Sequence, residues 1–124
     1  MDYTDLRQWL SKTYPEYPFQ QLGTSGATLL FEVLNHSGRS KLIIPAFICC
    51  ELSFMAVKAG KQLVHIDVDA NTLHMNHDQL KSALCESEDS DTSVLIDHSF
   101  GYPCSWIESL CREHSDLLII EDCV

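Results

Sequence analysis

The residues of this sequence that could do chemistry gather at one turn and at the ends of predicted strands. Residues 24–28, Thr-Ser-Gly-Ala-Thr, form a turn that enters a predicted helix, with Ser25 as its N-cap. Free backbone N–H groups and the helix dipole make such a start favourable for an anion. A serine and a glycine here are also typical of a plain helix cap, so both interpretations stand.

Polar residues also follow three of the predicted strands. Residues 67–69, 98–101 and 121–123 each come directly after an apolar run. In an open α/β sheet, ligands bind beyond the carboxyl ends of the strands. His98 could equally be a structural histidine, and Asp122 part of a solvated strand end. Spacing alone therefore leaves a functional cleft and a structural edge equally open.

Cysteine and histidine give no metal signature. The six cysteines lie at positions 49, 50, 85, 104, 111 and 123, with no C-x-x-C spacing. We expect them to be small, buried, reduced thiols. His74 and His77 form an H-x-x-H pair without a cysteine or carboxylate at zinc-finger spacing. We therefore predict no metal site.

Short apolar runs that alternate with amphipathic segments must position these residues. Strands are predicted over 41–44, 62–67, 93–98 and 117–120. Helices are predicted over 3–14, 27–36, 50–59, 76–86 and 103–114, with Asn76 capping the fourth and Pro103 in the first turn of the fifth. Nearly continuous apolar strands between helices indicate a parallel sheet that is covered on both faces.

The predicted fold is therefore α/β, a three-layer α/β/α sandwich around a four-stranded parallel sheet with right-handed crossovers. We predict a single domain over residues 1–124. Within it, residues 1–20 form an N-terminal helix and lead-in, and residues 21–124 form the α/β core.

Composition narrows the range of partners. The chain has 124 residues, 45% of them hydrophobic, and 18 acidic against 8 basic residues give a formal charge of −10. Nucleic acids and anionic membranes need a basic surface, which this chain lacks. The sequence shows no signal peptide and no apolar stretch long enough to span a bilayer. We expect a cytoplasmic protein with no nucleic-acid or membrane partner.

Six motifs follow one another through the chain in a fixed order. They are SGAT at 25–28, LIIPAF at 42–47, AGKQLVHIDVD at 59–69, NTLHMN at 71–76, HSFGYP at 98–103 and LIIEDC at 118–123. They resemble S-G-T-A, V-I-V-P-A-F, A-G-A-x-P-V-F-V-D-I-D, x-T-L-N-I-D, H-L-Y-G-x-P and V-I-E-D-A of the DegT/StrS-type sugar aminotransferases. Those proteins are pyridoxal-phosphate enzymes of fold type I, and the resemblance implies the N-terminal half of their large domain.

The resemblance implies a cofactor site at the matched positions. The backbone at Gly26, Ala27 and Thr28 would hold the phosphate of pyridoxal phosphate. Asp122 would pair with the pyridine nitrogen and keep it protonated, so that the ring can act as an electron sink. His98 would lie at the strand end nearest the ring. Cys49 stands where the family has the aromatic residue that stacks on the ring.

Departures from the family pattern weaken that site. Ala27 replaces a threonine, which removes one hydroxyl contact to phosphate, and Cys49 cannot stack on a ring. The phosphate-binding serine and the lysine that anchors the cofactor come after residue 124 in the family pattern. We therefore expect no catalytic residue, no bound cofactor and a truncated aminotransferase-like protein that is inactive by itself.

Three functions remain open on these grounds. The first is a non-catalytic domain with an interaction role, and the second is an enzyme half that a partner chain completes. The third is a binder of phosphorylated small molecules at the turn over residues 25–28. The last strand, 117–120, would be an open edge of the sheet, which predicts a homo-oligomer that covers it.

Overall fold

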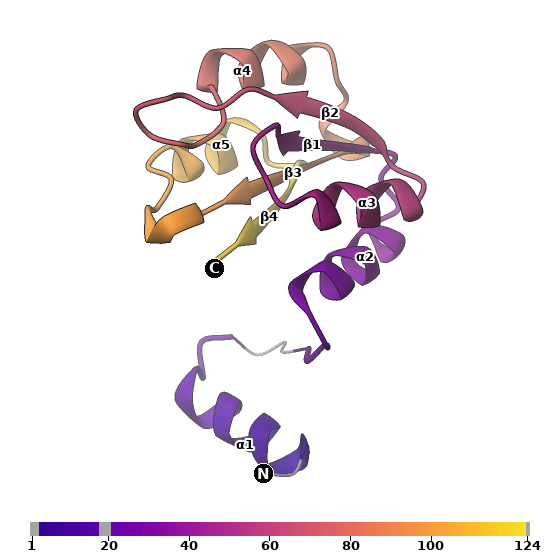
Figure 1. The fold of residues 1–124 in the computed structure, drawn as a ribbon, viewed down its shortest axis with the longest axis vertical. Helices are drawn as coiled ribbons and strands as arrows, with labels where there is room; N and C mark the ends of the chain where they lie inside the picture. Colours follow the sequence, from indigo (N-terminus) through magenta and orange to yellow (C-terminus); the bar gives the residue numbers. More distant parts are fainter. Residues whose placement is uncertain (1–2, 18–20, 124) are drawn as a thin grey trace.

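A computed structural model, which describes residues 3–17 and 21–123, places a parallel sheet between helices on both faces (Figure 1). Its strands are β1 (Lys41–Pro45), β2 (Gln62–Ile66), β3 (Thr92–Asp97) and β4 (Leu118–Asp122), in the order β2-β1-β3-β4. The helices are α1 (Tyr3–Thr13), α2 (Gly26–His36), α3 (Cys50–Lys58), α4 (His77–Cys85) and α5 (Ile107–Glu113). The α/β class and the four-stranded parallel sheet are confirmed, and β4 lies at an edge.

The sheet is buried on both faces because side chains alternate along each strand. Leu42 and Ile44 of β1 pack with α2 and α3, whereas Ile43 packs with α4 and α5. All three are fully buried, which explains why β1 reads as a continuous apolar run. Leu34 of α2 and Leu80 of α4 fill the two cores at 0% exposure. The three-layer α/β/α arrangement follows from these two cores.

The fifth helix begins later than the sequence suggests. The prediction started it near Pro103, but α5 runs over Ile107–Glu113, with Trp106 as its N-cap. Phe100 and Gly101 both adopt positive φ, at 62° and 74°, so the chain turns before Pro103 instead of entering a helix. The short 3₁₀ turns Asp89–Asp91 and Ser99–Gly101 were also not predicted.

The prediction of buried cysteines is wrong for five of the six. All six are free thiols, and Cys104 alone among them is buried. Cys85 follows the buried Leu84 in α4, and Cys111 follows the buried Leu110 in α5. Adjacent helical positions point about 100° apart, so a cysteine beside a core leucine faces solvent.

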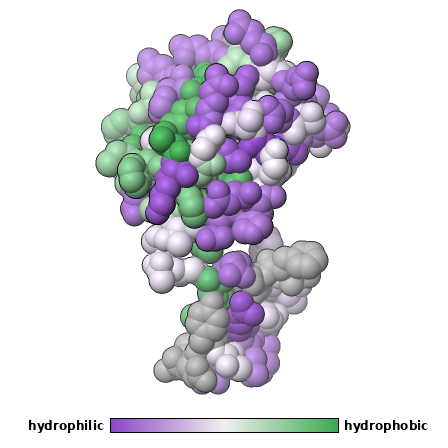
Figure 2. All heavy atoms as spheres, turned by 90° about the vertical axis from the view of Figure 1, so that its right-hand side faces the viewer, coloured by the Kyte–Doolittle hydropathy of each residue, from purple (hydrophilic) through white to green (hydrophobic). Residues whose placement is uncertain are grey.

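The surface carries apolar side chains in two places. Helix α1 projects away from the sheet (Figure 1), and none of its described side chains is buried. Hydrophobic atoms also gather on the face in Figure 2, which includes α2 and α3, and Val33, Phe54 and Val57 of these helices are exposed. Within residues 3–17 and 21–123, no helix is long and apolar enough to cross a membrane.

Candidate functional site

A cavity of about 470 Å³ lies beyond the carboxyl ends of β1, β3 and β4, where the topology of the sheet predicts ligand binding. It brings together four of the six predicted site residues, Gly26, Ala27, Cys49 and Asp122. The other lining residues are Ser25, Phe47, Ile48, Glu51, Leu52 and Asp97. Thr28 and His98 do not line this cavity.

The start of α2 forms one wall of the cavity and is fixed by a side-chain cap. The Ser25 Oγ accepts the Thr28 N–H at 3.2 Å, and the two hydroxyl oxygens lie 2.9 Å apart. Thr28 is thereby turned toward Ser25 and lines a second hollow beside α2. The N–H groups of Gly26 and Ala27, which begin the helix, have no intrahelical acceptor and remain for an anion.

Gly26 leaves this helix start open to a ligand. A Cβ built at Gly26 meets no atom within 4 Å, and its backbone is not in the left-handed region. The fold itself therefore does not require glycine at position 26. The absence of a Cβ instead leaves the backbone N–H groups at this helix start accessible, as an anion site needs.

Two carboxylates from neighbouring strand ends also line the cavity. Asp97 ends β3 and Asp122 ends β4, and the two are register partners in neighbouring parallel strands. Such strands lie about 4.8 Å apart, and register partners point to the same face. Partial burial, followed by the negative charge of Asp97, raises the pKa of Asp122, while His98 opposes that rise. Asp97 is not among the residues predicted from the sequence, although it directly precedes His98 at the strand end.

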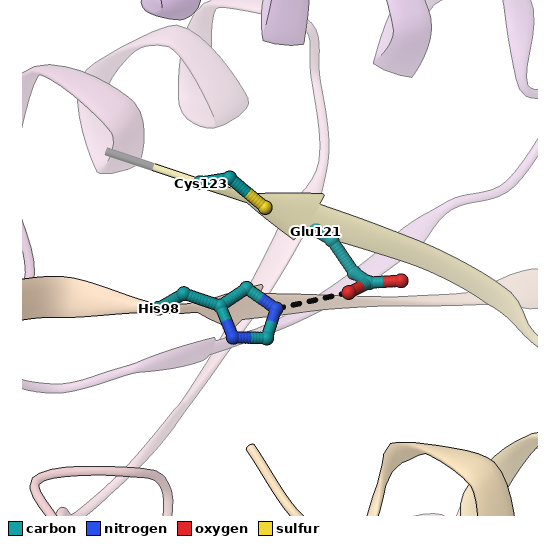
Figure 3. A group of neighbouring side chains, drawn as sticks. All are labelled: His98, Glu121 and Cys123. Carbon is teal, nitrogen blue, oxygen red and sulfur yellow. Dashed lines mark hydrogen bonds and ion pairs between the residues drawn. The ribbon is translucent and has the colours of Figure 1, made fainter. Parts of the chain in front are cut away.

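His98 braces the loop after β3 instead of facing the cavity. The Cys104 N–H donates to His98 Nδ1 at 3.2 Å, so Nε2 carries the ring hydrogen. Nε2 in turn donates to Glu121 Oε2 at 2.9 Å (Figure 3). The His98 backbone N–H also donates to the Asp122 carbonyl at 2.9 Å. The imidazole therefore ties β3, β4 and the Cys104 loop together.

A possible metal site is formed by His98, Glu121 and Cys123, whose potential ligand atoms lie within 4.8 Å of one another (Figure 3). A metal-binding histidine usually donates its second ring N–H to an acceptor. His98 instead accepts a hydrogen bond at Nδ1, which leaves the hydrogen on the nitrogen that would face the metal. Burial, then Glu121 and Asp122, raise the pKa of Cys123, which favours the thiol over the metal-binding thiolate. His98 and Glu121 are therefore arranged as a hydrogen-bonded brace, with Cys123 beside them.

Comparison with known proteins gives one family and one fold. The profile of the DegT/DnrJ/EryC1/StrS aminotransferase family matches residues 21–124. A Streptococcus pneumoniae protein assigned as a sugar aminotransferase, in its PMP form, superposes with a TM-score of 0.77 at 18% identity, over 97% of this chain and 34% of that one. An E. coli GDP-4-keto-6-deoxy-D-mannose-3-dehydratase with bound hydrated PLP gives 0.76 at 18%, over 95% and 33%.

An aminotransferase of the same family from Brucella abortus gives a TM-score of 0.72 at 18% identity, over 95% of this chain and 34% of that one. The chain thus spans about a third of the length of these solved structures. No curated protein matches the sequence. The superpositions identify the fold as that of the pyridoxal-phosphate aminotransferase large domain, in its N-terminal half.

Proposed function

Because the chain belongs to the DegT/DnrJ/EryC1/StrS aminotransferase family, we propose that its cavity binds the phosphate and ring of a pyridoxal-phosphate-type ligand without covalent attachment. One observation carries this proposal: the open start of α2 and the Asp122 carboxylate lie in the same cavity. A volume of about 470 Å³ is within the usual range for small-ligand sites.

The lining residues fit the two polar ends of such a ligand. The Gly26 and Ala27 N–H groups would hold the phosphate. The half-buried Asp122 would hold the protonated ring nitrogen. Burial raises the pKa of Asp122, and a cation beside it would stabilise the ionised carboxylate. When bound in this way, the cofactor supplies an electron sink for chemistry at an attached amine. Between the two ends, Cys49 offers a smaller apolar contact than an aromatic ring would.

We also propose that residues 1–124 by themselves do not catalyse transamination. Within the described residues, no lysine lines the cavity, so the site offers no amine for covalent attachment and no lysine base. Lys58, on the neighbouring helix α3, instead lies 5.2 Å from the centre of the Phe31 ring. The proposed role is therefore that of a sugar-aminotransferase-like binding domain.

Calorimetric titration with pyridoxamine 5′-phosphate tests this proposal. This probe carries an amine in place of the aldehyde, so surface lysines such as Lys58 cannot form an adduct with it. We expect saturable binding by the wild type and weaker binding by Gly26→Ala, whose methyl group would enter the cavity beside the phosphate. The variant keeps its fold because that methyl meets no protein atom within 4 Å. Absence of heat with the wild type, or equal affinity in both proteins, would overturn the proposal.

A second function, an enzyme half completed by another chain, is favoured by the open edge of β4. The solved relatives are about three times as long, so a further chain could add strands at that edge. Mixing this protein with a separate chain that carries the remaining family sequence should then restore transamination. An inactive mixture in which the two chains do bind would rule this function out.

A further inference from the structure

Asp97 places a second carboxylate beside the one that would meet the ring nitrogen. Both side chains line the cavity, and the register of β3 against β4 sets their strands directly side by side. We propose that Asp97 is a specificity-determining residue, which together with Asp122 selects ligands that carry a positively charged nitrogen in addition to a phosphate. This inference rests on the proposed function of the same cavity.

Charge balance within the cavity supports this role. The ionisable carboxylates of the lining are Glu51, Asp97 and Asp122, and no described lysine or arginine joins them. Arg39, Lys41 and Lys61 lie at the amino ends of β1 and β2, at the opposite edge of the sheet. A bare anion at the start of α2 is therefore opposed by three like charges. A ligand that also brings a cation to the Asp97–Asp122 side converts that repulsion into attraction.

A neighbouring side chain fixes the end of the strand that carries Asp97. The His74 Nδ1 hydrogen is donated to the Asp97 backbone carbonyl at 3.3 Å, which fixes the end of β3. The ring hydrogen of His98 is donated to Glu121, so it is not available to the cavity carboxylates. The burial of Asp122 and the charge of Asp97, which together raise the pKa of Asp122, agree with two carboxylates at close range.

The test compares two probes, pyridoxamine 5′-phosphate and inorganic phosphate, by calorimetric titration of the wild type and Asp97→Asn. We expect Asp97→Asn to bind pyridoxamine 5′-phosphate about two- to fivefold more weakly, as for a partly exposed charge pair. The same variant should bind inorganic phosphate more tightly than the wild type does, because one repelling charge is gone.

Asp116→Asn is the matched control, since it removes the same charge from an exposed turn outside the cavity. It should leave both affinities unchanged, whereas Asp97→Glu, which keeps the charge, should retain the preference of the wild type. If Asp97→Asn binds both probes as the wild type does, the inference fails while the proposed function stands. A wild type that binds neither probe overturns the proposed function, and the inference with it.

Discussion

Replacing Ser25 with alanine should cost about 1 kcal/mol of unfolding free energy, because it removes the cap of α2. The Ser25 Oγ accepts the Thr28 N–H at 3.2 Å and lies 2.9 Å from the Thr28 hydroxyl. Alanine offers neither contact, so the first turn of α2 loses its side-chain acceptor. For a chain of this length, the loss corresponds to a fall of about 3–5 °C in Tm, measured by differential scanning calorimetry.

Asn76→Ala provides a matched control for the effect of Ser25→Ala on ligand binding. The Asn76 Oδ1 caps α4 by accepting the Gln79 N–H at 3.0 Å, and Asn76 does not line the cavity. Both variants should lose similar stability, whereas only Ser25→Ala should weaken pyridoxamine 5′-phosphate binding, because it loosens the helix start that holds the phosphate. An unchanged Tm in Ser25→Ala would refute the capping argument. Equal loss of affinity in both variants would show that binding follows overall stability instead.

Further predictions address the carboxylate, the core, the missing aromatic residue and the sheet edge. Asp122→Asn should raise Tm near neutral pH and lose this advantage below the ordinary aspartate pKa. The raised pKa of Asp122 in the folded protein means that the wild type loses stability as pH rises and the carboxyl ionises, a loss that asparagine avoids. A difference in Tm that does not change with pH in thermal melts would contradict this. Leu80→Ala should cost about 2–5 kcal/mol in chemical denaturation, since Leu80 is fully buried, and a wild-type midpoint would argue against the predicted core. Cys49→Phe should tighten pyridoxamine 5′-phosphate binding in calorimetry, because an aromatic ring at this position can contact the ligand ring. Cys50→Phe, which lies outside the cavity, should not change the affinity, and equal effects of the two variants would contradict ring contact at position 49. Sedimentation at micromolar concentration should show an oligomer that covers the edge strand β4, and a monomer would count against it.

Sequence patterns located the sheet well because both of its faces are buried. A short, continuous apolar run between two helices, such as the one from Leu42 to Ile44, is typical of a buried strand in a parallel sheet. The helix caps at Ser25 and Asn76 also followed from residue type, since each side chain accepts the third N–H of its helix. The start of α5 could not be predicted from residue type. The turn before Pro103 depends on a positive φ at Phe100, and phenylalanine rarely adopts a positive φ.

The candidate site was only partly accessible to sequence reasoning, because strand order decides which strand ends meet. Asp122 lies at the edge of the sheet where strand ends are expected to meet, and Gly26, at the start of α2, lines the same cavity. His98 lies at that edge too, but its ring direction depends on the Cys104 loop, which no local pattern specifies. Asp97 was overlooked because it closes an apolar run, and its place beside Asp122 depends on the register between β3 and β4.

The features of this cavity point to a ligand held by its polar ends more than by its ring. Gly26 keeps the helix start open, and Asp122 with Asp97 adds two carboxylates to the lining. Cys49 and Ala27, in contrast, remove ring contact and a hydroxyl that the family pattern would provide at these positions. Because apolar contact usually supplies much of the affinity for an aromatic ligand, binding here should depend unusually strongly on charge. Salt should therefore weaken pyridoxamine 5′-phosphate binding in the wild type and do so less in Asp97→Asn; an affinity independent of ionic strength in both proteins would contradict this account.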